Sequence, residues 1–127
     1  MIKKYLQLKD TKERSLYSGY HKTIYLSALT SGSSVQYDKD SADLRQLVKT
    51  FGYGNIMTIV NQSGEDITID LNYSANNRYF IPAGNTLSLT SILYESFNVH
   101  NLDTTDTADN EVKITIGYER EVLREWI

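Results

Sequence analysis

Three aspartates lie at regular spacing in a polar segment late in the chain. Asp103, Asp106 and Asp109 belong to NLDTTDTADN, residues 101–110. Carboxylates are ligands for Ca²⁺, but an EF-hand loop places its ligands at alternate positions with a glycine at the sixth. These aspartates are three residues apart, and the segment has no glycine. The threonines between them favour a solvated hairpin loop, and calcium binding is the weaker alternative.

The side chains that usually carry catalysis form no recognisable pattern. His21 and His100 are far apart in the sequence, and a metal or catalytic site needs several convergent groups. The sequence contains no Gly-x-Ser-x-Gly elbow and no glycine pattern that binds phosphate. It has no cysteine, which excludes disulfides, thiolate chemistry and cysteine-based zinc sites. We therefore predict that the protein is not an enzyme and has no catalytic residue, no metal and no cofactor.

Aromatic residues are the groups best suited to binding. Phe51 and Tyr53 alternate with glycines at residues 51–54, where exposed rings would stack on sugars or pack on a partner protein. The alternative, which we favour, is that Phe51 fills the core where a helix meets the sheet. The chain has 10 tyrosines, and four of them suggest a tyrosine-rich outer face in the N-terminal third: Tyr17, Tyr20, Tyr25 and Tyr37.

The C-terminal segment EREVLREWI, residues 119–127, has an apolar face at helical spacing. A segment this short does not hold a helix alone, so it must dock on its own domain or on a neighbouring subunit. We favour the neighbour, because exchange of terminal segments is a low-cost route to oligomers. The predicted interface for oligomers or partners comprises Phe51, Tyr53, Val122, Leu123, Trp126 and Ile127.

Length and charge limit the remaining possibilities. A chain of 127 residues with 40% hydrophobic and 23% charged residues fits one globular domain. A net charge of −3 gives no electrostatic footprint for nucleic acid or an anionic membrane, so neither is expected as a partner. The N-terminus lacks the apolar region of a secretory leader, and no apolar run approaches the roughly 18 residues of a membrane span. We expect synthesis in the cytoplasm.

The elements that position these residues are mostly short strands. Alternation of apolar and polar side chains predicts strands at residues 3–9, 22–29 and 111–118, and a short one at 35–37. In the second of these, Ile24, Leu26 and Ala28 are expected to face the core. Residues 30–34 form a loop by composition. Residues 41–50 predict a helix with Ser41 as its N-cap.

Residues 55–90 predict four strands joined by turns. The nearly continuous apolar run at 56–60 is typical of a central strand covered on both faces. In residues 66–72 the apolar side chains are expected to be buried, and those of Thr68, Asp70 and Asn72 are expected to be exposed to solvent. Pro82 should end a strand or lie on an edge strand, and residues 81–84 suit a type I turn. A further strand is expected at 93–100.

Seven or eight short strands with frequent turns predict an all-β fold, an antiparallel β-sandwich with one short helix and an amphipathic C-terminal tail. We expect a single domain over residues 1–127. It is divided into N-terminal strands and a short helix (1–54), core hairpins (55–118) and the tail (119–127).

The second half resembles a small β-sandwich of virion structural proteins, such as phage capsid decoration and minor capsid proteins. The resemblance rests on the hairpin IVNQSGEDITIDL, the strand–turn–strand NRYFIPAGNTLSL and the closing strand EVKITIGYE. It implies a jelly-roll-like module located in the virion. It also implies a homo-oligomer, commonly a trimer, that binds a capsid shell protein, and it brings no catalytic residues.

The sequence therefore predicts a non-enzymatic virion structural protein that acts by self-assembly and protein–protein contacts. The alternative is a β-sandwich that binds a carbohydrate or another ligand. In that case Phe51, Tyr53 and Tyr79 would supply the stacking surfaces.

Overall fold

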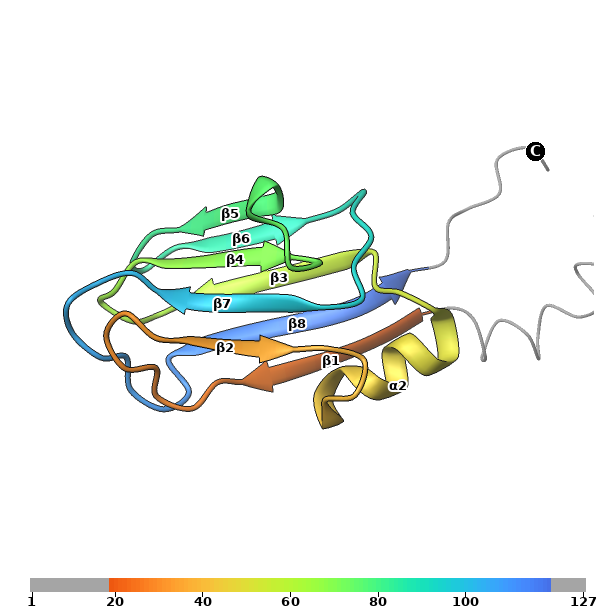
Figure 1. The fold of residues 1–127 in the computed structure, drawn as a ribbon, viewed down its shortest axis with the longest axis horizontal. Coiled ribbons are helices and arrows are strands. Elements are labelled where there is room, and N and C mark those ends of the chain that lie inside the picture. The colour runs from red at the N-terminus through yellow and green to blue at the C-terminus, as the bar shows by residue number, and fades with distance from the viewer. Residues whose placement is uncertain (1–18, 120–127) are drawn as a thin grey trace, which may run out of the picture.

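The computed structural model describes residues 19–119, apart from the side chain of Ala75, and within these residues the chain folds as a β-sandwich (Figure 1). The described part contains one α-helix, α2 (Ala42–Phe51), and one 3-10 helix, η1 (Ala75–Asn77). Its strands are β1 (Gly19–Tyr25), β2 (Ser34–Tyr37), β3 (Ile56–Asn61), β4 (Ile67–Leu71), β5 (Arg78–Ile81), β6 (Thr86–Leu89), β7 (Phe97–Asn101) and β8 (Val112–Glu119). The predicted antiparallel β-sandwich with one short helix is confirmed.

The strands are wound as a jelly roll. One sheet has the order β1-β8-β3-β6 and the other the order β2-β7-β4-β5, and every pairing is antiparallel. Strand 1 therefore pairs with strand 8, 2 with 7, 3 with 6 and 4 with 5, as in one long hairpin rolled up on itself. This winding, with two four-stranded sheets face to face, defines the jelly-roll form of the β-sandwich.

The winding corrects the predicted core hairpins. β3 and β4 lie in different sheets, as do β5 and β6, so neither IVNQSGEDITIDL nor NRYFIPAGNTLSL forms a hairpin. Among the described strands, only β4 and β5 are both consecutive and paired. Buried Asn61 links the two connections that pass from one sheet to the other. Its Nδ2 donates to the Glu65 carbonyl at 2.7 Å, between β3 and β4, and to the Ile81 carbonyl at 3.0 Å, at the end of β5. Alternation along a strand reports which face is buried and not which strand is its neighbour.

The turn after β5 is shifted by one residue from the prediction. β5 ends before Pro82, as expected, but the hydrogen bond runs from the Asn85 N–H to the Pro82 carbonyl at 3.1 Å. Gly84 is then the third residue of the turn, with φ of 77°. A positive φ at the third position is the requirement of a type II turn, so the predicted type I turn at 81–84 is wrong.

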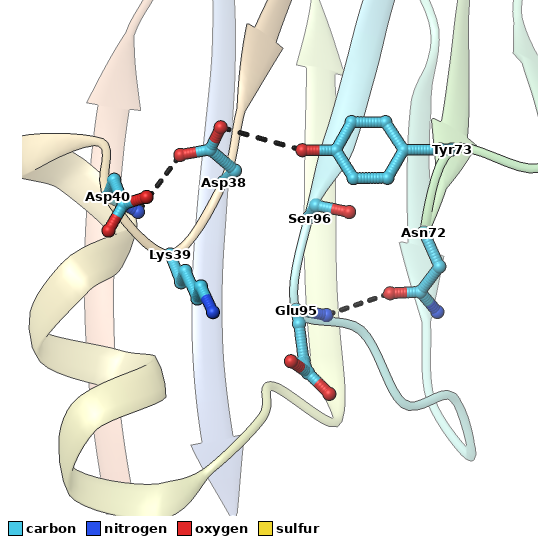
Figure 2. A pocket seen from close by; sticks show the side chains of 7 residues that line it. All are labelled: Asp38, Lys39, Asp40, Asn72, Tyr73, Glu95 and Ser96. Carbon is cyan, nitrogen blue, oxygen red and sulfur yellow. Dashed lines mark hydrogen bonds between the residues drawn. The ribbon is translucent and has the colours of Figure 1, made fainter.

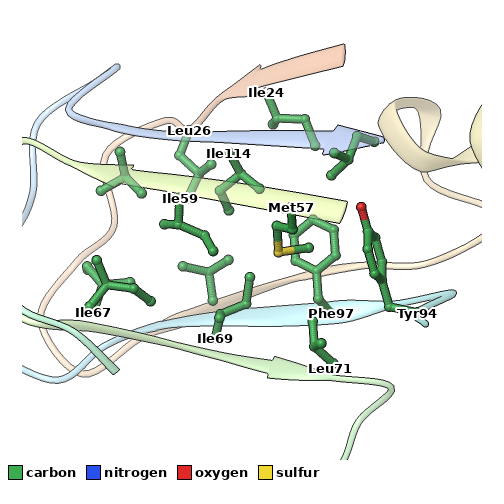
Figure 3. Packing of buried hydrophobic residues seen from close by; sticks show 14 of the residues in the cluster. Ile24, Leu26, Met57, Ile59, Ile67, Ile69, Leu71, Tyr94, Phe97 and Ile114 are labelled. Carbon is green, nitrogen blue, oxygen red and sulfur yellow. The ribbon is translucent and has the colours of Figure 1, made fainter. Parts of the chain in front are cut away.

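Apolar side chains from the inner faces of both sheets fill the interior (Figure 3). Met57 and Ile59 of β3 oppose residues such as Ile69 and Phe97 of the second sheet, and all four are at most 1% exposed. The intervening residues of β3 are only half-buried, so this strand is covered on one face and not on both.

Helix α2 follows the predicted span closely and packs against β1 and β8. Leu44 and Leu47 are fully buried, which gives a short helix the tertiary contact it needs. Ser41 is the N-cap residue, but its hydroxyl accepts a bond from the Asp38 N–H at 3.0 Å and not from a helix amide. None of the helices in the described residues is long and apolar enough to span a membrane.

Strand boundaries differ from the prediction mainly at the ends. β1 begins at Gly19 and ends at Tyr25, and Ala28 is exposed because the chain has left the sheet there. β7 begins at Phe97 and not at 93, because Tyr94 turns into the interior and bridges to Gly54. The strands at 35–37 and 111–118 are confirmed as β2 and β8, whereas the strand predicted at 3–9 lies outside the described residues.

Candidate functional site

Two of the predicted interface residues belong to a cluster of four half-buried rings, here named the aromatic end: Tyr20, Phe51, Tyr53 and Tyr118. Phe51 stacks on Tyr118 with ring centroids 4.5 Å apart and an interplanar angle of 11°. Tyr53 meets the same ring edge-on at 5.7 Å. Phe51 thus packs where the helix meets the sheet, as the interpretation favoured from the sequence predicts.

The aromatic end is also where the described chain begins and ends. Gly19 pairs with Glu119 in the β1–β8 ladder, so the first and last described residues are neighbours. Asn55 fixes this point, since its Nδ2 donates to the Glu119 carbonyl at 2.8 Å and its Oδ1 accepts from the Glu119 N–H at 2.8 Å. The four other predicted interface residues lie outside the described residues: Val122, Leu123, Trp126 and Ile127.

Of the four tyrosines named for the predicted outer face, two pack against other rings and one is exposed there. Tyr20 packs on Phe51, and Tyr37 stacks on Phe97 at 5.0 Å, where burial raises the pKa of its hydroxyl. Tyr25 is 59% exposed on the outer face of β1, with the Lys113 ammonium 5.9 Å from its ring centroid. Tyr17 lies outside the described residues.

A pocket of about 510 Å³ opens where β2 leads into α2, where β4 ends and where β7 begins (Figure 2). None of its lining residues was predicted from the sequence to belong to a site. Its lining combines three carboxylates, one ammonium, one amide, one hydroxyl and one phenol: Asp38, Asp40, Glu95, Lys39, Asn72, Ser96 and Tyr73. Three segments distant in sequence supply these groups, so no local sequence motif predicts the pocket.

The Asp38 carboxylate lines this pocket and is held in place by hydrogen bonds. Its Oδ1 accepts from the Asp40 N–H at 2.9 Å and from the Ser41 N–H at 3.1 Å, and these bonds, the first above all, hold the pKa of Asp38 below its usual value. Its Oδ2 lies 3.5 Å from the hydroxyl of Tyr73. Gln36 donates to the same hydroxyl at 3.1 Å. The carboxylate therefore stays ionised and orients both the start of α2 and the ring of Tyr73.

A second polar cluster lies on the outer face of the β2-β7-β4-β5 sheet. Asp70 receives two hydrogen bonds from Arg78, at 2.6 and 2.8 Å, and His100 Nε2 is 3.1 Å from its Oδ2. These bonds, Arg78 first, lower the pKa of Asp70. Thr68 and Asp70 were expected to be exposed to solvent, but both are buried. Long side chains on the neighbouring strands β5 and β7 cover this face. The alternation of apolar and polar residues along one strand does not predict burial by the side chains of neighbouring strands.

The aspartates of the 101–110 segment act as structural acceptors. Asp103 Oδ2 accepts from the Asp66 N–H at 2.7 Å, and Asp109 Oδ1 accepts from the Ala28 N–H at 2.7 Å. Asp106 Oδ1 accepts from the Ser31 N–H at 2.8 Å. Across residues 19–119 no group of three or more histidine or acidic side chains is placed to hold a metal ion. The three carboxylates point to different partners, which gives calcium binding no support.

We expect Asp109→Ala to lower the free energy of unfolding by about 1 kcal/mol, because the Ala28 N–H loses a charged acceptor at the surface. Asp109→Asn keeps an acceptor oxygen and should lose less. Thermal unfolding of both variants, with and without millimolar calcium chloride, checks this expectation. A calcium-dependent rise in the melting temperature that disappears in Asp109→Ala would restore the calcium alternative.

Neither the family models nor the curated proteins give a match to this chain. Among solved structures, the coat protein of Tobacco streak virus is similar in two forms. The C2 crystal form shares 13% identity over 84% of this chain and 89% of that chain, with a TM-score of 0.45. The coat protein dimer shares 12% identity over the same fractions, with a TM-score of 0.42. These values establish no family for the chain.

Proposed function

We propose that this protein is a non-enzymatic structural protein of a virion, which acts by self-assembly and protein–protein contacts. The observation that carries the proposal is the jelly-roll winding of its two sheets. Viral capsid proteins, lectin domains and cupins share this winding, so the step from fold to function is an analogy between folds.

The packing of the interior disfavours one group within that analogy, the barrels that hold a metal or ligand inside. Apolar side chains fill the space between the sheets, where a barrel with an internal metal or ligand site would leave a polar cavity (Figure 3). Function is then expected on the outer surface, through contacts with other molecules. The described pocket and the aromatic end both lie on that surface.

The finer proposal is a capsid decoration or minor capsid protein, made in the host cytoplasm and incorporated into the virion. Its partners would be further copies of itself, as a trimer, and a capsid shell protein. Glu119, the first residue of the tail and the last described residue, directly follows Tyr118 of the aromatic end. We propose that the apolar residues of this tail pack against the aromatic end of a neighbouring copy.

Removal of residues 120–127 is expected to convert an oligomer into a monomer, since the deletion leaves β8 intact and takes away its proposed contact. Size-exclusion chromatography with light scattering gives the mass of both forms. Replacement of Leu123 and Trp126 by aspartate should have the same effect, whereas Glu121→Gln on the polar face should have none. An unchanged mass after the deletion would contradict assembly through the tail.

The carbohydrate-binding alternative loses the stacking surfaces that the sequence assigned to it. Phe51 and Tyr53 are engaged with Tyr118, and Tyr79 is half-buried against the core. A ring that already stacks on another ring has less free face to offer a sugar.

A further inference from the structure

Ser96 contributes an unused hydroxyl to the floor of the pocket between α2, β4 and β7. The residue is 5% exposed, and it lines the same pocket as Tyr73 (Figure 2). Its carbonyl accepts from the Asn72 N–H at 2.9 Å, but no described residue hydrogen-bonds to its hydroxyl. This hydroxyl is open to solvent from the pocket, since the fully buried side-chain atoms without a partner among the described residues are Thr68 Oγ1 and Asn98 Oδ1. It is therefore available to a ligand that enters the pocket.

Tyr73 is exposed and yet held in one orientation. The residue is 54% exposed, while the backbone at Asn72 and Tyr73 has φ of 55° and 59°. Two successive non-glycine residues in the left-handed region are strained and persist only when other contacts impose them. The Asn72 side chain supplies these contacts, because it donates to the Leu93 carbonyl at 2.9 Å and accepts from the Glu95 N–H at 2.8 Å.

The remaining groups of the pocket are free to bind. Within the described residues, the carboxylates of Asp40 and Glu95 and the ammonium of Lys39 have no hydrogen-bonding or ionic partner. The pocket thus offers acceptors, a donor and a hydroxyl around one aromatic ring. Its volume of about 510 Å³ is in the range typical of sites for small molecules.

We propose that this pocket binds a neutral hexopyranose unit of a glycan. A hexopyranose has several hydroxyls, each both donor and acceptor, and one ring face of C–H groups that packs on an aromatic ring. Tyr73 is the stacking surface, Ser96 binds at the floor, and the carboxylates of Asp40 and Glu95 accept from sugar hydroxyls. The proposal goes beyond assembly and does not depend on it.

The charges of the pocket disfavour an acidic sugar, because its carboxylate would meet those of Asp38, Asp40 and Glu95 at close range. A lysine or arginine side chain from a partner protein would be repelled by the ammonium of Lys39 but attracted by the three carboxylates, so it is the competing ligand that the test must exclude. A neutral, hydroxyl-rich ligand avoids repulsion from the carboxylates and also uses the ring of Tyr73.

Saturation-transfer difference NMR on the full chain tests the proposal. The probes are the methyl glycosides of glucose, galactose and mannose, with N-acetylneuraminic acid and acetyl-arginine amide as the acidic and cationic probes. We expect at least one neutral glycoside to receive saturation. Its addition should shift the ¹⁵N amide resonances of Tyr73 and Ser96. A glycan array then extends the test from single sugars to larger glycans.

Tyr73→Ala should weaken binding of the neutral glycoside about tenfold, the cost of losing one stacked ring. Ser96→Ala should weaken it severalfold, and Tyr25→Ala is the matched control because Tyr25 is an exposed tyrosine on the other sheet. Thermal unfolding and light scattering show that each variant folds and assembles as the parent does. The proposal fails if no neutral glycoside binds on either platform, if Tyr73→Ala binds as the parent does, or if only acetyl-arginine amide shifts these resonances.

Discussion

Replacement of Gly54 by alanine is expected to destabilise the protein by about 3 kcal/mol, the upper part of the usual range for an overpacked core. A methyl group at this position would lie 2.3 Å from Cζ and 2.6 Å from the hydroxyl oxygen of Tyr94. Tyr94 has little freedom to move, since it is 1% exposed and its hydroxyl donates to the Ile56 carbonyl at 2.7 Å. The same hydroxyl accepts from the Gly117 N–H at 3.1 Å, and burial raises its pKa.

Urea unfolding of Gly54→Ala and Gly64→Ala measures the effect against a matched control. A Cβ at Gly64 would meet no heavy atom within 4 Å, so that variant should unfold close to the parent. A double-mutant cycle with Tyr94→Leu adds a second criterion, because Gly54→Ala should cost much less once the ring is gone. Equal stabilities of the two alanine variants would show that the contact between Gly54 and Tyr94 is not a tight constraint.

Loss of the Arg78 guanidinium is expected to destabilise the protein strongly at pH 7 and far less at pH 3. The carboxylate of Asp70 is 7% exposed, and Arg78→Met would leave it without its two shortest hydrogen bonds. A nearly buried charge that loses its partner is costly. Asp70→Asn removes the charge itself and should cost about 2 kcal/mol at pH 7, the loss of hydrogen bonds to a charged group.

The pH dependence follows from the direction of the pKa shift. Arg78 holds the pKa of Asp70 below the ordinary aspartate value of 3.8, so the folded state binds the Asp70 proton less tightly than the unfolded state. The resulting stability is complete above pH 3.8 and is lost as the pH falls toward the lowered pKa. The difference between the parent and Arg78→Met should therefore shrink in acid.

Chemical denaturation at pH 7 and pH 3 measures this difference. Arg45→Met is the matched control, since Arg45 is exposed and its Nη2 donates only to the backbone carbonyl of Asp40 among the described residues. It should have a small effect at both values of pH. A destabilisation by Arg78→Met that is the same at pH 7 and pH 3 would assign the effect to packing and not to the ion pair.

Local periodicity predicted the elements with the strongest pattern. The alternation in residues 111–118 gave β8, with Ile114 and Ile116 fully buried, and the helical spacing in residues 41–50 gave α2, with Leu44 and Leu47 fully buried. These predictions succeeded because the period of a side-chain pattern is set by the backbone conformation of the same few residues. The boundaries of β1 and β7 were less accurate, since hydrogen bonds to distant strands decide where a ladder ends.

The candidate sites were largely missed for a related reason. Tyr73, Asp38 and Ser96 come from three segments, and nothing in the neighbourhood of any one of them marks it as part of a pocket. The same holds for Asp70 and His100, which lie on adjacent strands 30 residues apart in sequence. Phe51 and Tyr53 were identified from their spacing between glycines, but their contacts with Tyr118 were not.

For residues 19–119, the sequence by itself determined an all-β fold with one short helix, and it determined which face of most strands is buried. Only the tertiary structure decided that β3 and β4 lie in opposite sheets, that β1 pairs with β8, and that Tyr73 and Ser96 line one pocket. The physical reason is the sequence separation over which each kind of interaction acts. Propensity and alternation act between residues a few positions apart, whereas the jelly-roll winding is fixed by contacts between strands at opposite ends of the chain.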